Sequence, residues 1–274
     1  MDKLHVYVNQ SVLTSPGKYA SAIEALPDDI DPLLEAVRGL FVHVDSLAIY
    51  GLEEIEFSRQ PRTTLSVSER LDRIFEKSDE SLATVRSIDI RELGTCRDYA
   101  LMTCAILRQK LIPARVRCGF ARYFTPGRYE DHWICEYWQT AEQRWARADA
   151  QLDSAHCRHL GIVFKTSDLP EGEFFTAKEA WEVVRRDILP AGLFGHGKAI
   201  GEWFIWVNLA RDFLSLKGYE TSPWDTWRAV ADLLPTLTNS DRAYCDALAA
   251  ATAELEQSKN APLPIPEPFW VIPK

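Results

Sequence analysis

GTCRDYALMTCAILRQKLIPARVRCGF, residues 94–120, is the stretch that decides the fold. A turn at Gly94-Thr95 precedes Cys96, and the run that follows to Lys110 contains no Gly or Pro and is rich in strong helix formers. Its apolar residues fall on several sides of a helix, which predicts a helix buried at the centre of the domain. Pro113 ends it, and residues 114–120 then alternate in polarity as a strand does.

Cys96 falls in the first turn of this predicted helix. The backbone N–H groups of a first turn have no partner within the helix, and the helix dipole is positive there. Both effects stabilise a thiolate over a thiol, and the thiolate is the nucleophilic form of cysteine. The position therefore favours a reactive cysteine, although a lone cysteine in an apolar helix is more often a small buried core residue.

Two further runs, residues 132–138 and 144–149, have the pattern of strands and are joined by a polar stretch. An antiparallel hairpin with an even-numbered loop places His132 directly opposite Asp149, on the same face of the sheet. At that separation a carboxylate can hold an imidazole. Asp153 would lie beyond the end of the strand in this register, so it is the weaker candidate for the acid.

These segments together resemble the core of the transglutaminase-like superfamily. The resemblance is carried by GTCRDYA, IPARVRCGF, DHWICEYW and RWARADAQLD, in that order along the chain. It implies a papain-like fold with a Cys-His-Asp triad, in which the nucleophile matches Cys96, the general base matches His132 and the orienting acid matches Asp149. The implied cofactor set is empty, and the implied substrate contains an amide.

Acyl transfer is the chemistry that needs these three groups. The Cys96 sulfur would attack a carbonyl and form a thioester, with the backbone N–H of Cys96 as one oxyanion donor. Trp133 and Trp138 could help to exclude water from a pocket. Water as the acceptor would make the protein an amidase or protease, and an amine would make it an acyltransferase. A carrier-bound thioester as donor stays open, and so does a binding or scaffold protein that kept the fold without the activity.

Composition limits the remaining classes of function. With 274 residues, 46% of them hydrophobic, the chain can bury a large core. A net charge of −9 and a pI near 5.3 argue against a nucleic-acid surface. Neither a leader peptide nor a membrane-spanning stretch is evident, which predicts a soluble cytoplasmic protein. The sequence makes no prediction of the oligomeric state.

Two other motifs are interpreted as structural. His156-Cys157-Arg158-His159 lacks the further ligands that a metal site needs, and no metal is expected. Residues 192–198 match the first seven positions of a GxxxxGK phosphate loop, but Ala199 stands where a hydroxyl is required and a helix precedes the loop. We therefore expect a glycine-rich loop there and no nucleotide. The cysteines that fall within predicted helices and strands are expected in the core; these are Cys104, Cys118, Cys135 and Cys245.

The predicted fold class is α+β, with a papain-like, transglutaminase-like core made of a central helix and an antiparallel sheet. A single domain, 1–274, is expected to comprise an N-terminal helical part (1–89), the catalytic core (90–165) and a C-terminal helical part with a Pro-rich tail (166–274). Helices are predicted over the following segments, the first two in the N-terminal part and the others in the C-terminal part: residues 28–44, a helix capped by Ser68, residues 176–188, residues 202–216, a helix capped by Ser222, and residues 240–257.

Overall fold

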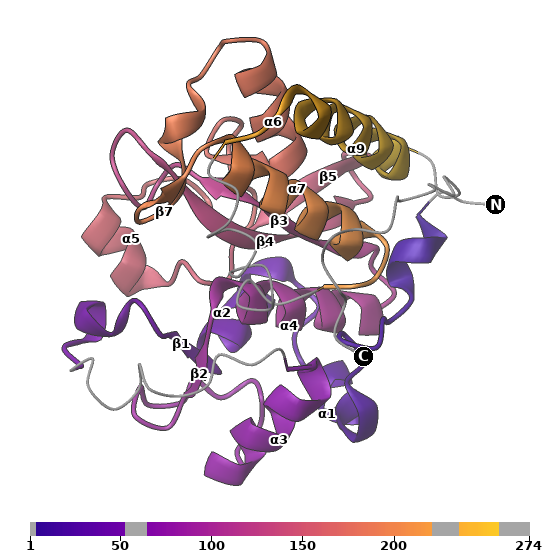
Figure 1. Cartoon of the computed structure of the whole chain (residues 1–274). Helices are drawn as coiled ribbons and strands as arrows, with labels where there is room; N and C mark the ends of the chain where they lie inside the picture. Colours follow the sequence, from indigo (N-terminus) through magenta and orange to yellow (C-terminus); the bar gives the residue numbers. More distant parts are fainter. Residues whose placement is uncertain (1–3, 53–64, 221–235, 258–274) are drawn as a thin grey trace. The chain divides into compact units, whose positions relative to one another are not determined.

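The fold is α+β, as predicted, in a computed structural model that describes residues 4–52, 65–220 and 236–257. The chain divides into two compact units, one made of Met1–Arg117 and Trp133–Glu171 and the other of Cys118–His132 and Gly172–Lys274. Figure 1 shows the elements of both. Strands β3 (Ala114–Ala121) and β4 (Tyr129–Gln139) each contribute residues to both units. The predicted division into three parts of a single domain stays a prediction.

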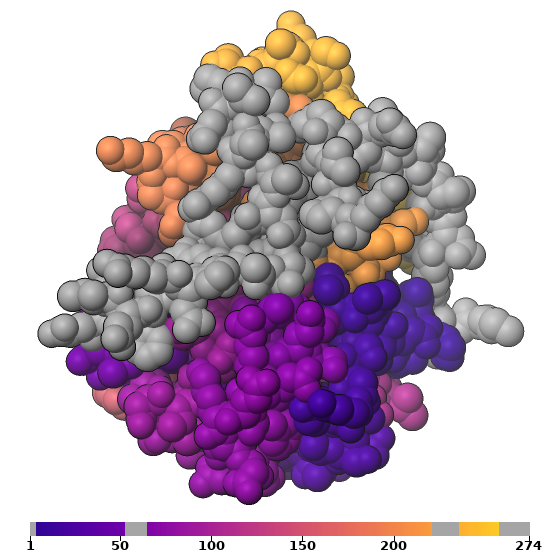
Figure 2. Space-filling view, turned by 60° about the horizontal axis from the view of Figure 1, so that its bottom comes forward, coloured from indigo at the N-terminus to yellow at the C-terminus, as the bar shows by residue number. Residues whose placement is uncertain are grey.

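The first unit is built around α4 (Cys96–Gln109), and every residue of this helix from Cys96 to Arg108 is buried. This confirms the prediction of a central helix. Three α-helices pack against it in the described part of the unit: α1 (Ala20–Glu24), α2 (Ile30–Arg38) and α3 (Val67–Lys77). The short helix η2 (Gly17–Tyr19) contacts α3, and Figure 2 shows the N-terminal segment and the region of α3 side by side on one face. The remaining helices of this unit are η1 (His5–Val8), η3 (Leu47–Tyr50) and α5 (Ser154–Leu160).

Two predictions for the N-terminal part were wrong. The helix expected over residues 28–44 ends at Arg38, and Phe41–His43 form strand β1, which pairs in parallel with β2 (Glu92–Gly94). Gly39 weakens the helix, and the β-branched Val42 favours a strand. The N-cap of α3 is Ser66 instead of Ser68, because Ser66 and Glu69 form a reciprocal capping box.

The larger sheet has the strand order β6-β3-β4-β7-β8, in which β6 is Phe174–Thr176 and β8 is Ala199–Ile200, with β5 (Arg144–Ala148) paired to β4. The pairing of β4 with β5 is antiparallel, as predicted, whereas β4 pairs with β7 (Phe194–His196) in parallel. The sheet is therefore mixed, where a purely antiparallel one was expected. The cause is non-local, since β7 returns to β4 from a segment that lies more than 50 residues further along the chain.

The register of the β4–β5 hairpin differs by two residues from the predicted one. Gln139 pairs with Arg144 and Cys135 pairs with Ala148, which is the last paired position. Four residues thus form the loop, and Gln143 closes it with a left-handed backbone at φ 53°. Because the shift is even, the side chains keep the faces that the prediction gave them.

Glu136 is the centre of a buried charge cluster on these strands. Its carboxylate accepts hydrogen bonds from Arg115 Nε at 2.7 Å, Arg117 Nη1 at 2.7 Å and Arg147 Nε at 3.1 Å. Burial alone would raise the pKa of Glu136, but the three guanidinium groups outweigh it and hold this pKa well below its ordinary value. The Arg115 guanidinium also stacks 4.0 Å from the centre of the Trp145 ring.

Among the described residues of the second unit, three α-helices pack on one another: α6 (Ala177–Arg185), α7 (Glu202–Leu216) and α9 (Asn239–Gln257). The predictions of these helices are confirmed to within three residues at each end. The expected glycine-rich loop over 192–198 forms η4 (Ala191–Leu193) and β7, and β7 pairs with β8 (Ala199–Ile200). The helix expected to begin at Ser222 and the Pro-rich tail lie outside the described residues.

Candidate active site

Cys96 is the first residue of α4 and follows directly on β2 and Thr95. It is 9% exposed. The turn before it is held on one side by β1, since β1 pairs with β2 and Val44 N donates to Gly94 O at 3.0 Å. The predicted placement of Cys96 in the first turn of a buried helix is thereby confirmed.

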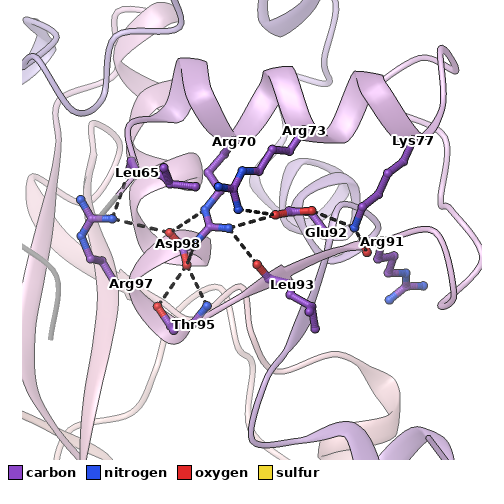
Figure 3. A network of polar contacts seen from close by, with 10 residues as sticks. All are labelled: Leu65, Arg70, Arg73, Lys77, Arg91, Glu92, Leu93, Thr95, Arg97 and Asp98. Carbon is purple, nitrogen blue, oxygen red and sulfur yellow. Dashed lines mark hydrogen bonds and ion pairs between the residues drawn. The ribbon is translucent and has the colours of Figure 1, made fainter. Parts of the chain in front are cut away.

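A buried network fixes the turn that carries Cys96 (Figure 3). The Asp98 carboxylate accepts hydrogen bonds from the backbone N–H of Thr95 at 2.8 Å and from its hydroxyl at 3.1 Å. Arg70, on α3, donates to both oxygens of the same carboxylate, at 3.1 Å from Nε and 2.8 Å from Nη2. Such a bidentate pair is directional as well as charged, so it fixes the position of Asp98 and of the turn bonded to it.

The same arginine reaches the strand before the turn. Arg70 Nη1 donates to Leu93 O at 2.8 Å and to Glu92 Oε1 at 3.1 Å, while Lys77 Nζ lies 2.8 Å from Glu92 Oε2. The side chains of Arg70 and Glu92 are only 8% and 5% exposed. We did not predict this network, although the spacing of Thr95 and Asp98 is that of a capping box and was a signal for part of it.

Asp149 directly follows β5 and is 1% exposed. Its backbone N–H donates to Thr166 O at 2.8 Å, and its Oδ1 accepts from Gln151 N at 2.9 Å. Arg38 Nη2 donates to Thr166 Oγ1 at 2.6 Å and to Asp149 O at 3.4 Å. The backbone on both sides of the carboxylate is therefore held in place.

Asp153, the weaker sequence candidate for the acid, caps α5. Its Oδ1 accepts from the backbone N–H groups of Ala155 and His156, each at 2.9 Å, and lies 3.0 Å from His156 Nδ1. Its Oδ2 accepts from the Tyr50 hydroxyl at 2.8 Å. Burial would raise the pKa of Asp153, but the bonds from His156 and Tyr50 hold it well below the ordinary value. One carboxylate oxygen of Asp153 thus caps α5, and the other accepts from Tyr50.

His132 belongs to the second unit, whereas Cys96 and Asp149 belong to the first. The imidazole is 2% exposed and is surrounded by aromatic rings. The ring of Phe124 meets it edge to face with centroids 4.9 Å apart, and those of Tyr123 and Phe174 do so at 5.9 Å and 6.5 Å. The sequence did not predict that these three rings surround His132, because Phe174 comes from a strand 42 residues further along the chain.

The two tryptophans proposed for a pocket lie in different surroundings. Trp133 is 1% exposed, and Trp138 is partly exposed and packs edge to face on Trp145 at 5.7 Å. Their role in a pocket stays a prediction.

The remaining cysteines divide as expected. Cys104, Cys118, Cys135 and Cys245 are each 0% exposed, which confirms them as core residues. Cys157 is partly exposed, and burial raises the pKa of its thiol. Its neighbour His156 is buried against Asp153 and Tyr50, and the described residues contain no cluster of His, Cys, Asp and Glu suited to a metal. No helix among them is long and apolar enough to cross a membrane.

Comparison with known proteins agrees with the resemblance seen in the sequence. Residues 43–150 match the model of the transglutaminase-like superfamily, so this segment includes Cys96, His132 and Asp149. No curated protein matches the chain. A solved structure described as "a Putative Cysteine Protease from Cytophaga hutchinsonii" is similar at 17% identity and a TM-score of 0.36. The alignment covers 55% of this chain and 43% of that one.

Proposed function

We propose that the protein is a cysteine enzyme that transfers the acyl group of an amide to water or to an amine, because residues 43–150 match the model of the transglutaminase-like superfamily. The observation that carries the proposal is the position of Cys96 at the N-terminus of a buried, braced helix. A thiolate there would lie near backbone N–H groups and the positive end of the helix dipole. The Arg70 guanidinium offsets the charge of Asp98, so the cap does not oppose the thiolate with an uncompensated carboxylate.

His132 acts as the general base in this proposal and Asp149 as the acid that orients it. The observed hairpin register supports this assignment. Ala148 pairs with Cys135, three residues after His132 on β4, and Asp149 directly follows Ala148.

The proposed reaction has two steps, formation of a thioester and its breakdown. The Cys96 thiolate attacks the amide carbonyl, and the oxyanion that forms accepts a hydrogen bond from the Cys96 backbone N–H. The C–N bond then breaks, the amine leaves with a proton from His132, and a thioester remains. In the second step water or an amine gives its proton to His132 and attacks the thioester, which releases the acyl product and restores the thiolate. Asp149 stabilises the imidazolium in both steps.

The test is the rate of Cys96 alkylation by iodoacetamide as a function of pH, read by mass spectrometry of the labelled peptide. We expect Cys96 to react well below the ordinary thiol pKa of about 8.5, and this acid-side reactivity to be lost in His132→Ala and weakened in Asp149→Asn. Cys157 is an internal control, since it is partly exposed and the pKa of its thiol is raised.

An inert Cys96, or one that behaves the same without His132, would rule out the catalytic assignment. The protein would then be studied as a binding or scaffold protein that kept this fold. Asp153→Asn provides the matched control for Asp149→Asn, because Asp153 is bonded to α5 and Tyr50. An equal effect of the two substitutions on Cys96 would argue against Asp149 as the orienting acid.

A further inference from the structure

Helix α7, which lies outside the family match, carries a buried amide bonded to the strand of His132. Asn208 is 0% exposed. Its Nδ2 donates to Asp131 Oδ1 at 2.8 Å and to Gly119 O at 3.2 Å, and its Oδ1 accepts from Arg211 Nη1 at 2.9 Å. One amide group therefore joins β3 to the residue immediately before His132.

The surrounding contacts hold α7 and β4 in fixed positions. Asp212, four residues after Asn208, accepts from the backbone N–H of Cys118 at 3.0 Å, which anchors α7 to β3 a second time. On β4, the ladder to β7 pairs Tyr129 with Phe194 and Glu130 with Gly195. Asn208 bonds to the side chain of Asp131, the next residue. Each of the three residues before His132 is therefore bonded either to β7 or to α7.

The imidazole itself packs on residues of the same unit. Gly119 allows this, because a Cβ at that position would lie 2.1 Å from Phe175 O and 2.7 Å from the Phe174 ring. Its absence lets β6 (Phe174–Thr176) pair closely with β3 and brings the Phe174 ring to the edge of His132. The residue before His132 is thus bonded to α7, and the ring of His132 packs on Phe174 from β6 as well as on Phe124 and Tyr123.

We propose that Asn208 is a positioning residue for His132, which makes α7 part of the site. This inference rests on the proposed function. Asn208 acts through Asp131 and the β4 backbone and has no chemical step of its own. A base must stand within hydrogen-bond reach of the proton it takes, and a displacement of about 1 Å can lower a rate by as much as roughly a hundredfold.

A double-mutant cycle on Cys96 alkylation near neutral pH separates this role from a structural one. We expect Asn208→Leu, which keeps the branched shape and the number of heavy atoms of the side chain, to lower the rate by roughly tenfold, within the range that such displacements cause. In the His132→Ala background the same substitution should have no further effect, since the residue it positions is absent. A merely structural loss would lower the rate by the same factor in both backgrounds and would overturn the inference.

The bond between Asn208 and Asp131 can also be removed from the other side, at Asp131, which is partly exposed where Asn208 is fully buried. Asp131→Ala should reproduce the effect of Asn208→Leu, and Asp131→Asn, which keeps an oxygen to accept from Nδ2, should restore most of the wild-type rate. Wild-type rates in both Asn208→Leu and Asp131→Ala would disprove the positioning role while leaving the triad intact. If His132→Ala itself changes nothing, the proposed function fails and the inference falls with it.

Discussion

Two buried ion clusters of the first unit differ in what they hold. Around Asp98 and Glu92, Arg70 bonds to carboxylates and also to the backbone oxygen of Leu93, while Asp98 accepts from the backbone N–H of Thr95. Around Glu136, the contacts that tie Arg115, Arg117 and Arg147 join side chain to side chain across strands. The first cluster fixes a main-chain turn and the second fixes a sheet.

This difference separates stability from reactivity. Both clusters remove charges from water, which is costly unless every charge is paired. Loss of a group in either cluster should therefore destabilise the fold. Only loss in the Asp98 cluster should also move the backbone next to Cys96.

The largest effect is expected for Glu136→Gln. It leaves three cations without their carboxylate, so the free energy of unfolding should fall by about 3–5 kcal/mol, as measured by urea denaturation. The alkylation rate of Cys96 in the folded variant should stay at the wild-type value. A large change in that rate would mean that the two clusters are not separable.

Arg70→Met should cost less stability, about 2–3 kcal/mol, because Glu92 keeps Lys77 and Asp98 keeps its bonds from Thr95. Unlike Glu136→Gln, it should also slow Cys96 alkylation, since the turn loses its link to α3. Arg73→Met is the matched control: Arg73 is 40% exposed and lies 3.5 Å from Glu92, so both measurements should stay near wild type.

Acid should weaken the Glu136 cluster. A carboxyl whose folded-state pKa is lowered stabilises the fold above its unfolded pKa, near 4.3 for Glu, and that contribution is lost as the pH falls below this value. Each unit of pH in this range should cost up to about 1.4 kcal/mol from Glu136 alone. Denaturation midpoints of wild type and Glu136→Gln should converge toward low pH, and parallel curves would contradict the assignment.

The smallest effect is expected for Thr95→Val, which removes the capping hydroxyl at the Cys96 turn. A lost cap of this kind costs about 1 kcal/mol. Ser66→Ala removes the corresponding hydroxyl from α3 and should cost a similar amount. Thermal denaturation should rank the two together, whereas alkylation should be slower in Thr95→Val alone, because Ser66 caps a different helix.

The elements that could be predicted from the sequence are those with local causes. Breakers such as Pro113 delimit α4, and alternating polarity identifies β3 and β4. The Cys96 turn was predictable for the same reason. The family resemblance supplied the candidate roles of His132 and Asp149, and those roles stay predictions.

The features that could not be predicted depend on contacts between distant segments. Arg70 and Asp98 are 28 residues apart, and no local pattern pairs them. Asn208 and Asp131 are 77 residues apart. The hairpin register was missed because it depends on the left-handed backbone of Gln143, a residue with no special preference for that conformation.

The four bonds at Asp153 have a consequence for genetic screens of this protein. A library selected only for soluble expression would discard changes at Asp153 that leave no acceptor oxygen, since they remove the cap of α5 and a partner of Tyr50 together. Asp149→Asn, which keeps an oxygen to accept from Gln151 N, would pass the same selection and be found only by an assay of Cys96. Variants of two aspartates four residues apart would therefore fall into separate phenotypic classes. One class would give a poor yield of soluble protein, and the other would give a normal yield of protein whose Cys96 has lost reactivity.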